Sequence, residues 1–164
     1  NSKEESKEES KEESEEEDDL DTLEDTYWQG KFDYGTFIQS MMTSDEETLA
    51  ILNEFDGELY MTVSLTFYED TVELGYEDLE DFSEEFEIYF EELIEYAYDA
   101  LEVEGDYDDF YEEARGSYPE DITENIENQI VDYTYRNGVL KIDGDKCEMN
   151  GNKIVYDGVT LKKK

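Results

Sequence analysis

Carboxylates are by far the most numerous side chains in this sequence that could do chemistry. The 164 residues include 51 Asp and Glu against 12 Lys and Arg, with no His and a single Cys. Without His, no Ser-His or Cys-His nucleophile can form, and the commonest ligand of zinc and haem is missing. Among so many acids, two carboxylates at the spacing of a glycosidase pair can arise by chance. No shaped constellation of residues accompanies them, so we predict no catalytic residue, no cofactor and no enzymatic activity.

A thiol and an acidic loop are the next candidates for chemistry. Cys147 lies between Lys146 and Glu148 in an alternating strand pattern, so we predict a buried side chain and not a reactive thiol. The segment from Glu104 to Asp109 reads EGDYDD, but it lacks the alternating oxygen ligands and the terminal Glu of an EF-hand loop. We predict a loop between two helices with acids at the N-cap, and no metal site. Weak cation binding in this loop is the alternative.

Large apolar side chains of the predicted strands are the candidates for binding an apolar ligand. Six of them could line a pocket: Trp28, Phe32, Met61, Phe67, Tyr133 and Tyr135. The alternative is that they form an ordinary hydrophobic core, where most large apolar residues are found.

The strands that would position these residues are predicted in two blocks. Residues 27–34 and 59–68 alternate in side-chain type, and a tight turn at Glu69-Asp70 leads to a third strand through Tyr76. The last third of the chain predicts an antiparallel meander of five strands, at 131–136, 139–142, 145–149, 153–156 and 159–162. They are separated by dipeptides that favour hairpin turns with positive φ, namely Asn137-Gly138, Asp143-Gly144, Asn150-Gly151 and Asp157-Gly158.

Helical patterns fill the gaps between the strands. A short helical stretch is predicted from Phe37 to Phe55, and an apolar stripe from Phe82 to Leu101 predicts a helix of about six turns whose other face is almost entirely acidic. Residues 117–120 read SYPE, which resembles a capping box with Pro in the first turn. This motif predicts a further helix with a stripe of isoleucines, at Ile122, Ile126 and Ile130.

Together these elements predict an α+β fold. We expect an antiparallel eight-stranded barrel, or a curved open sheet, with an inserted acidic helical segment at about residues 77–130. Residues 26–164 are expected to form this domain. Residues 1–25 are expected to be a disordered acidic tether, because the repeat SKEE places like charges at i,i+4 and opposes a helix. A self-repelling tail of this kind suits a spacer; a tail that only solvates the domain is the alternative.

Charge is distributed unevenly along the chain, whose net charge is −39. Residues 68–127 hold 25 acids and one base, whereas residues 128–164 hold 5 acids and 7 bases. The acidic segment 68–127 disfavours binding to nucleic acid, because such binding requires a basic patch. It disfavours contact with an anionic membrane surface for the same reason. It favours solubility and cationic partners. The sequence contains no run of 18 apolar residues, so it predicts no membrane-spanning helix.

The layout resembles the lipocalin-like (calycin-like) lipoproteins of Gram-positive bacteria. The resemblance covers residues 27–162. It rests on the opening strand motif WQGKF at 28–32, the hairpin LTFYEDT at 65–71, and a closing meander that runs from YTYRNG at 133–138 to KIVY at 153–156. It implies an exported protein at the bacterial cell envelope, a mature form whose signal peptide and anchoring Cys preceded Asn1.

Two functions follow as hypotheses. The first is a surface-tethered, monomeric, non-enzymatic binding module that takes a small apolar ligand or a peptide, and that meets the membrane only through its lipid anchor. The alternative is an acidic protein-interaction or nucleic-acid-mimic module that binds a basic partner. In neither is nucleic acid itself a partner.

Overall fold

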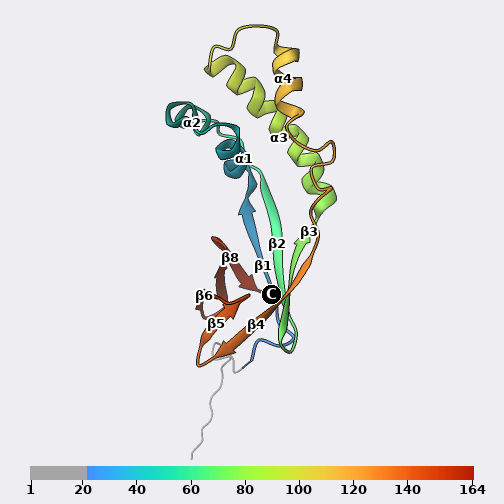
Figure 1. Cartoon of the computed structure of the whole chain (residues 1–164), viewed down its shortest axis with the longest axis vertical. Helices are drawn as coiled ribbons and strands as arrows, with labels where there is room; N and C mark the ends of the chain where they lie inside the picture. The colour runs from blue at the N-terminus through green and yellow to red at the C-terminus, as the bar shows by residue number, and fades with distance from the viewer. Residues whose placement is uncertain (1–21) are drawn as a thin grey trace, which may run out of the picture. The chain divides into compact units, whose positions relative to one another are not determined.

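The chain folds into two compact units. The computed structural model describes residues 22–164 (Figure 1). The barrel unit comprises residues 22–31, 63–75 and 128–164, and the helical unit comprises residues 32–62 and 76–127. The predicted tether is residues 1–25, and positions 1–21 of it lie outside the described residues. Its last four residues are ordered, because Leu23 is fully buried and the Asp25 N–H donates a 2.8 Å hydrogen bond to the carbonyl of Phe67.

Eight strands close into an antiparallel barrel in sequence order, and the chain also has four helices among the described residues. The predicted α+β class is confirmed, and of its two alternatives the structure has the barrel and not the open sheet. The seam of the barrel pairs the first strand with the last, with Trp28 opposite Lys163 and Gly30 opposite Leu161. The strands are β1 (Tyr27–Asp33), β2 (Tyr60–Phe67), β3 (Thr71–Glu77), β4 (Gln129–Arg136), β5 (Val139–Ile142), β6 (Asp145–Asn150), β7 (Lys153–Tyr156) and β8 (Val159–Lys163).

Tight turns set the register of the closing meander. Asn137-Gly138, Asp143-Gly144 and Asp157-Gly158 each have positive φ at both residues and connect directly paired strand ends, as type I′ turns do. The fourth turn lies one residue later than predicted, because β6 and β7 pair through Asn150 opposite Lys153. Only Gly151 of that turn has positive φ, at 64°, as the first central residue of a type II′ turn does.

Alternating side chains of the strands build the core of the barrel unit. Trp28, whose side chain is fully buried, donates its indole N–H to the Thr26 hydroxyl at 2.9 Å. The rings of Phe67 and Tyr133 meet edge to face with centroids 4.8 Å apart. Further buried residues of this unit are Leu65, Val72, Leu140, Ile142, Ile154, Val159 and Leu161. Burial of these large side chains supplies most of the favourable free energy of folding this unit.

Four helices form the helical unit: α1 (Tyr34–Met42), α2 (Glu46–Leu52), α3 (Leu79–Ala100) and α4 (Tyr107–Arg115). The predicted stretch from Phe37 to Phe55 is helical but divides in two, because Asp45 caps a new helix by accepting from the Thr48 N–H at 3.0 Å. Within the helical unit, α3 packs against both α2 and α4, and α1 packs against α2.

The predicted stripe of α3 is confirmed. Its buried residues are Phe82, Phe86, Tyr89, Phe90, Leu93, Ile94 and Ala97, which share one face at helical spacing. The buried Gln39 of α1 donates a 3.0 Å hydrogen bond to the hydroxyl of Tyr89, so both polar groups are satisfied in the core of the helical unit.

The predicted helix after Ser117 is wrong. Residues 117–128 form turns, bends and irregular chain, and Ile130 lies in β4 with 64% of its surface exposed. Arg115 explains the difference, because its guanidinium donates to the backbone carbonyls of Tyr118, Pro119 and Glu120 at 3.4, 2.8 and 2.9 Å. In a helix these carbonyls would accept from N–H groups four residues later. The capping-box sequence therefore begins no helix.

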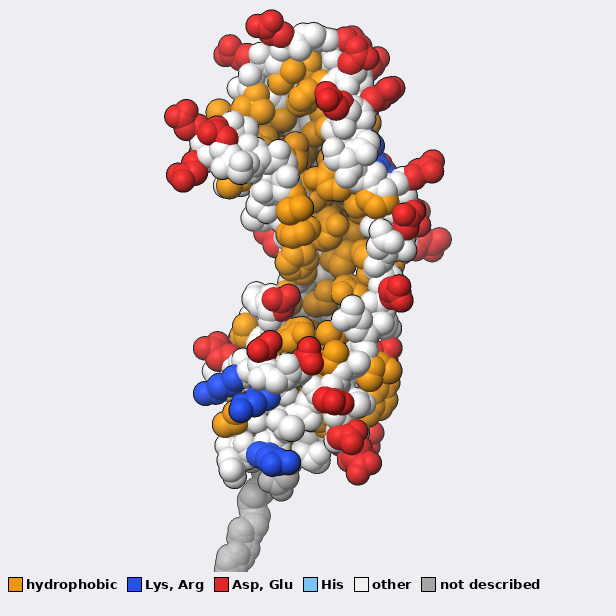
Figure 2. Space-filling view, in the orientation of Figure 1, with side chains coloured by type: hydrophobic (Ala, Val, Ile, Leu, Met, Phe, Trp, Pro, Cys, Tyr) orange, Lys and Arg blue, Asp and Glu red, His pale blue; other side chains and the backbone are white. Residues whose placement is uncertain are grey.

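Charge separates between the two units. The helical unit has 29 acids and one base, a net charge of −28, whereas the described part of the barrel unit has 10 acids and 8 bases, a net charge of −2. Figure 2 shows Asp and Glu side chains ringing a face of hydrophobic side chains over the helices, and Lys or Arg gathered over the strands. Among residues 22–164, no helix is both long and apolar enough to cross a bilayer.

Candidate functional site

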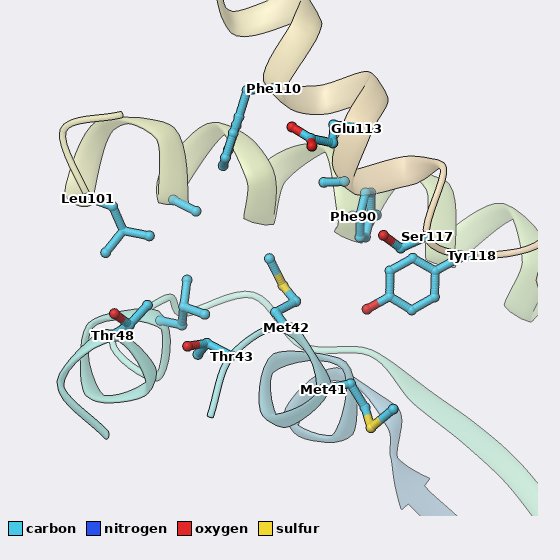
Figure 3. Close-up of a pocket in the computed structure, with 13 residues that line it drawn as sticks. Met41, Met42, Thr43, Thr48, Phe90, Leu101, Phe110, Glu113, Ser117 and Tyr118 are labelled. Atoms are coloured by element: carbon cyan, nitrogen blue, oxygen red, sulfur yellow. The ribbon is translucent and has the colours of Figure 1, made fainter. Parts of the chain in front are cut away.

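The helical unit contains an apolar groove of about 400 Å³, which we call the α1–α4 groove. Figure 3 shows Met42 pointing into it from α1 and Phe110 pointing into it from the opposite wall, while Met41 points away from its centre. Its lining comes from all four helices and the segment after α4: Met41, Met42, Thr43, Thr48, Leu52, Phe90, Ala97, Leu101, Phe110, Glu113, Ala114, Ser117 and Tyr118.

Helical spacing places these side chains on facing walls. Phe90, Ala97 and Leu101 lie at i, i+7 and i+11 along α3 and its C-cap, and Phe110 and Ala114 lie at i and i+4 on α4. The opposite wall begins at Met42, the last residue of α1. The chain then becomes extended at Thr43, and this break between α1 and α2 separates the two helices that form that wall.

The groove offers little ionisable chemistry. Of its lining residues, only Glu113 and Tyr118 carry an ionisable side chain. Burial raises the pKa of the Tyr118 hydroxyl, so this side chain is neutral at physiological pH. The Thr48 hydroxyl already donates to the Asp45 carboxylate at 2.7 Å. A lining of this kind suits retention of an apolar group, with a few hydroxyls to orient it.

A second hollow lies around Arg115, but its polar groups already satisfy one another. The guanidinium is bidentate to Glu87, with Nε–Oε1 at 3.2 Å and Nη2–Oε2 at 2.7 Å, and it lies 5.3 Å from the centroid of the Phe86 ring. The hydrogen bonds to Glu87 raise the pKa of Arg115 above its ordinary value, so the guanidinium stays charged. This site holds the chain after α4 in place.

The six residues predicted to line a ligand pocket lie in different units. Four of them, at positions 28, 67, 133 and 135, belong to the barrel unit, whereas Phe32 and Met61 belong to the helical unit. Tyr133 donates its hydroxyl to the carbonyl of Tyr68 at 2.7 Å, and Met61 is 3% exposed. Phe32 packs against the rings of Tyr34 and Phe37. None of the six lines the α1–α4 groove; their role in binding stays a prediction.

Of the other chemical candidates, Cys147 takes the position that the sequence predicts, whereas residues 107–109 of the predicted acidic loop form the first turn of α4. Cys147 is 7% exposed, and burial raises the pKa of its thiol, which disfavours the reactive thiolate at neutral pH. Glu104 and Gly105 lie between α3 and α4, and Asp106 is the N-cap of α4. Within residues 22–164, no group of three or more His, Cys, Asp or Glu side chains is arranged to hold a metal ion.

The groove residues were not predicted, although part of their signal is visible. Tyr107, Phe110, Tyr111 and Ala114 lie at i, i+3, i+4 and i+7, which is a helical stripe. The acidic residues that lie among them, such as Asp108 and Asp109, favour the prediction of a loop in this segment. The paired Met41 and Met42 gave no signal by themselves, because only the packing of α1 and α2 opposite α4 makes them part of a groove.

Comparison with protein-family models, with curated proteins and with solved structures finds no match for this chain. The resemblance to lipocalin-like lipoproteins therefore stays a prediction. What the residues and the geometry establish is an eight-stranded antiparallel barrel and, in the helical unit, an open apolar groove.

Proposed function

We propose that this protein is a non-enzymatic binding module that holds an apolar ligand, or the apolar side chains of a peptide, in the α1–α4 groove. The observation that carries the proposal is the groove itself. Its volume of about 400 Å³ lies in the range of small-ligand sites, and its walls are formed mainly by side chains such as Met42, Phe90 and Phe110. The only carboxylate in its lining is Glu113, whereas glycoside hydrolysis uses a pair of carboxylates.

The proposal includes a location at the outer face of a bacterial envelope. Two features support it: the SKEE repeats suit an extended spacer, and an eight-stranded antiparallel barrel is the architecture of lipocalins. In this proposal α3 and α4, between β3 and β4, are an acidic helical insertion of a lipocalin-like lipoprotein. The coding sequence that precedes residue 1 tests the location. A signal peptide followed by a Cys for lipid attachment supports the location. A start codon directly before Asn1, with no signal peptide, contradicts it.

Binding by the groove is tested with a neutral apolar fluorophore, N-phenyl-1-naphthylamine, which the acidic surface does not repel. The full chain is expected to give saturable fluorescence enhancement. Two variants should weaken binding by about tenfold, Met42→Gln, which makes the wall polar, and Ala114→Trp, which fills the groove.

The matched control is Ile88→Gln, which removes a similar side chain from α3 at a position that is 61% exposed and does not line the groove. Circular dichroism and urea unfolding verify that each variant is folded. Equal affinity of the dye for wild type, Met42→Gln and Ala114→Trp would overturn the proposal.

The net charge of −28 on the helical unit favours a second candidate function, a charge-mimic module that occupies a basic protein. A mimic would bind through exposed acids and not through the groove. Its affinity would therefore fall steeply with salt and stay unchanged in Met42→Gln. Retained dye binding with no recovery of a basic protein at low salt would exclude the mimic and leave the groove proposal intact.

A further inference from the structure

The apolar surface around the groove extends beyond what a groove-filling small molecule would cover. Met41, at the mouth of the groove, is 65% exposed, and Phe37, one turn earlier on the same side of α1, is 43% exposed. An exposed apolar surface that continues from a groove marks a site for a larger partner. Met41 and Met42 also provide flexible, polarisable side chains, which adapt to apolar groups of different shapes.

Negative charge surrounds this apolar surface. Glu46 and Glu47 are in the first turn of α2, Asp108 and Asp109 are in the first turn of α4, and Glu113 is part of the groove lining. Figure 2 shows hydrophobic side chains in the middle of a face over the helices and carboxylates around them. An anionic ligand or an acidic peptide would be repelled from this rim.

No free positive charge in the helical unit offsets these acids. Arg115 is the one base among residues 32–62 and 76–127, and its guanidinium is occupied by Glu87 and by three backbone carbonyls. The rim therefore lacks an internal cation to neutralise it. A cation that reaches the rim must come from outside this unit.

We propose that the occupant of the α1–α4 groove is a cationic amphipathic helix of a partner protein. Its apolar residues, at i, i+3 or i+4 and i+7, enter the groove and cover Met41, while its Lys and Arg residues meet the acids of α2 and α4. This inference rests on the proposed function, because it requires an apolar groove that binds, and it adds the charge and the shape of the ligand.

The test compares synthetic peptides of about 18 residues, or five helical turns, that share one leucine face. Their polar faces carry Lys, Gln or Glu, and a fourth peptide keeps the Lys residues but replaces every Leu with Ser. Affinity for the full chain is measured by fluorescence anisotropy, in about 0.05 M and about 0.5 M NaCl. The Lys peptide should bind at least about tenfold more tightly than the Gln peptide at low salt, should lose that advantage at high salt, and should displace N-phenyl-1-naphthylamine.

Two variants separate the contribution of charge from that of the groove. The double variant Glu46→Gln, Glu47→Gln should weaken the Lys peptide by about tenfold at low salt, while the neutral dye still binds because neither residue lines the groove. Met42→Gln should weaken both, and Ile88→Gln should weaken neither.

The possible outcomes distinguish this inference from the proposed function. If the dye binds but the Lys peptide is no tighter than the Gln peptide, the inference fails and the apolar site stands. If the Lys peptide without leucines binds as tightly as the amphipathic one, charge alone is responsible, and the inference also fails. If neither dye nor peptide responds to Met42→Gln, both fail.

Discussion

At the scale of single residues, Arg115 has the widest structural role in the helical unit. It joins α4 to α3 through its bidentate contact with Glu87, and its Nη atoms hold three consecutive carbonyls of the chain that leaves α4. Its side chain is 17% exposed and lies over the Phe86 ring. A planar fork of donors is required for all of these contacts, and lysine cannot reproduce it.

Replacement of Arg115 by Met is therefore expected to destabilise the protein by about 1–2 kcal/mol, since Glu87 and the carbonyls lose their charged donor in a partly exposed site. Arg115→Lys should recover only part of this loss. Urea unfolding followed by circular dichroism measures both. Arg136→Met, at an exposed position of β4, is the control and should change the free energy of unfolding by less than about 0.5 kcal/mol. Equal stability of Arg115→Met and wild type would contradict this role.

Three tyrosines of the helical unit, one buried and two half-buried, give a pH dependence. Burial raises the pKa of the hydroxyls of Tyr34, Tyr89 and Tyr118 above the ordinary value near 10. The folded state therefore keeps these protons to higher pH than the unfolded chain does. Their contribution to stability is complete below the unfolded pKa, and it is lost as pH rises above about 10. The urea concentration at the midpoint of unfolding should fall steadily between about pH 9 and about pH 11, a range that brackets the ordinary tyrosine pKa.

Tyr89→Phe tests the origin of that alkaline loss. The variant removes a titrating hydroxyl from the helical core, together with its hydrogen bond from Gln39. It should be less stable than wild type at neutral pH, but its stability should decline less steeply above pH 10. Absorbance at 295 nm, which follows tyrosinate, reports the same groups directly. An unchanged decline in Tyr89→Phe would assign the pH dependence to other residues.

At the scale of elements, the meander could be predicted from sequence because its signals are local. Dipeptides such as Asn137-Gly138 select a turn by their own backbone preferences, and the strand bounds of β5 and β7 were predicted to the residue. The helix predicted at residues 117–130 failed because a residue outside the motif decides its conformation. Arg115 takes the backbone carbonyls, and Glu87, 28 residues away, holds Arg115.

The groove lies beyond local prediction for a similar reason. Its walls combine Met42, Phe90 and Phe110, which are distant in sequence and meet only when α1, α3 and α4 pack. Hydrophobic periodicity predicts which face of a helix is apolar. It does not predict where three such faces leave a gap.

The barrel seam between β1 and β8 yields a prediction at this scale. Gly30 pairs with Leu161, and a Cβ at Gly30 would meet the carbonyl oxygen of Thr160 and lie 3.1 Å from the Leu161 Cα. Because the obstructing atoms are backbone, they can move only if the two strands separate. Gly30→Ala should therefore destabilise the protein by about 1–3 kcal/mol. The measurement is thermal and urea unfolding.

The control for the seam is Lys31→Ala, an exposed position on the same strand, which should be close to neutral. If Gly30→Ala matched Lys31→Ala in stability, the close approach of β1 to β8 would be wrong.

At the scale of the whole molecule, the uneven distribution of charge should dominate the response to salt. The acids of the helical unit repel one another in the folded state, with one base to offset 29 acids, and the unfolded chain relieves this repulsion by expanding. Screening becomes effective at a Debye length of about 10 Å, which corresponds to about 0.1 M salt. Stability should rise with NaCl over this range and then level off.

Each 1 kcal/mol that screening adds to the free energy of unfolding should raise Tm by about 3–5 °C in a fold of this size. Differential scanning calorimetry resolves a shift of this size.

Three exposed acids of α3 test where the repulsion lies, namely Glu84, Glu92 and Glu95. Changing all three to Gln should raise Tm at low salt and reduce the gain on adding NaCl, because fewer charges then need screening. The matched control changes three exposed bases of the barrel unit to Gln, namely Lys141, Lys146 and Lys153. It should not raise Tm, since that unit is nearly neutral. An equal rise in both triple variants would show that the repulsion is not concentrated in the helical unit.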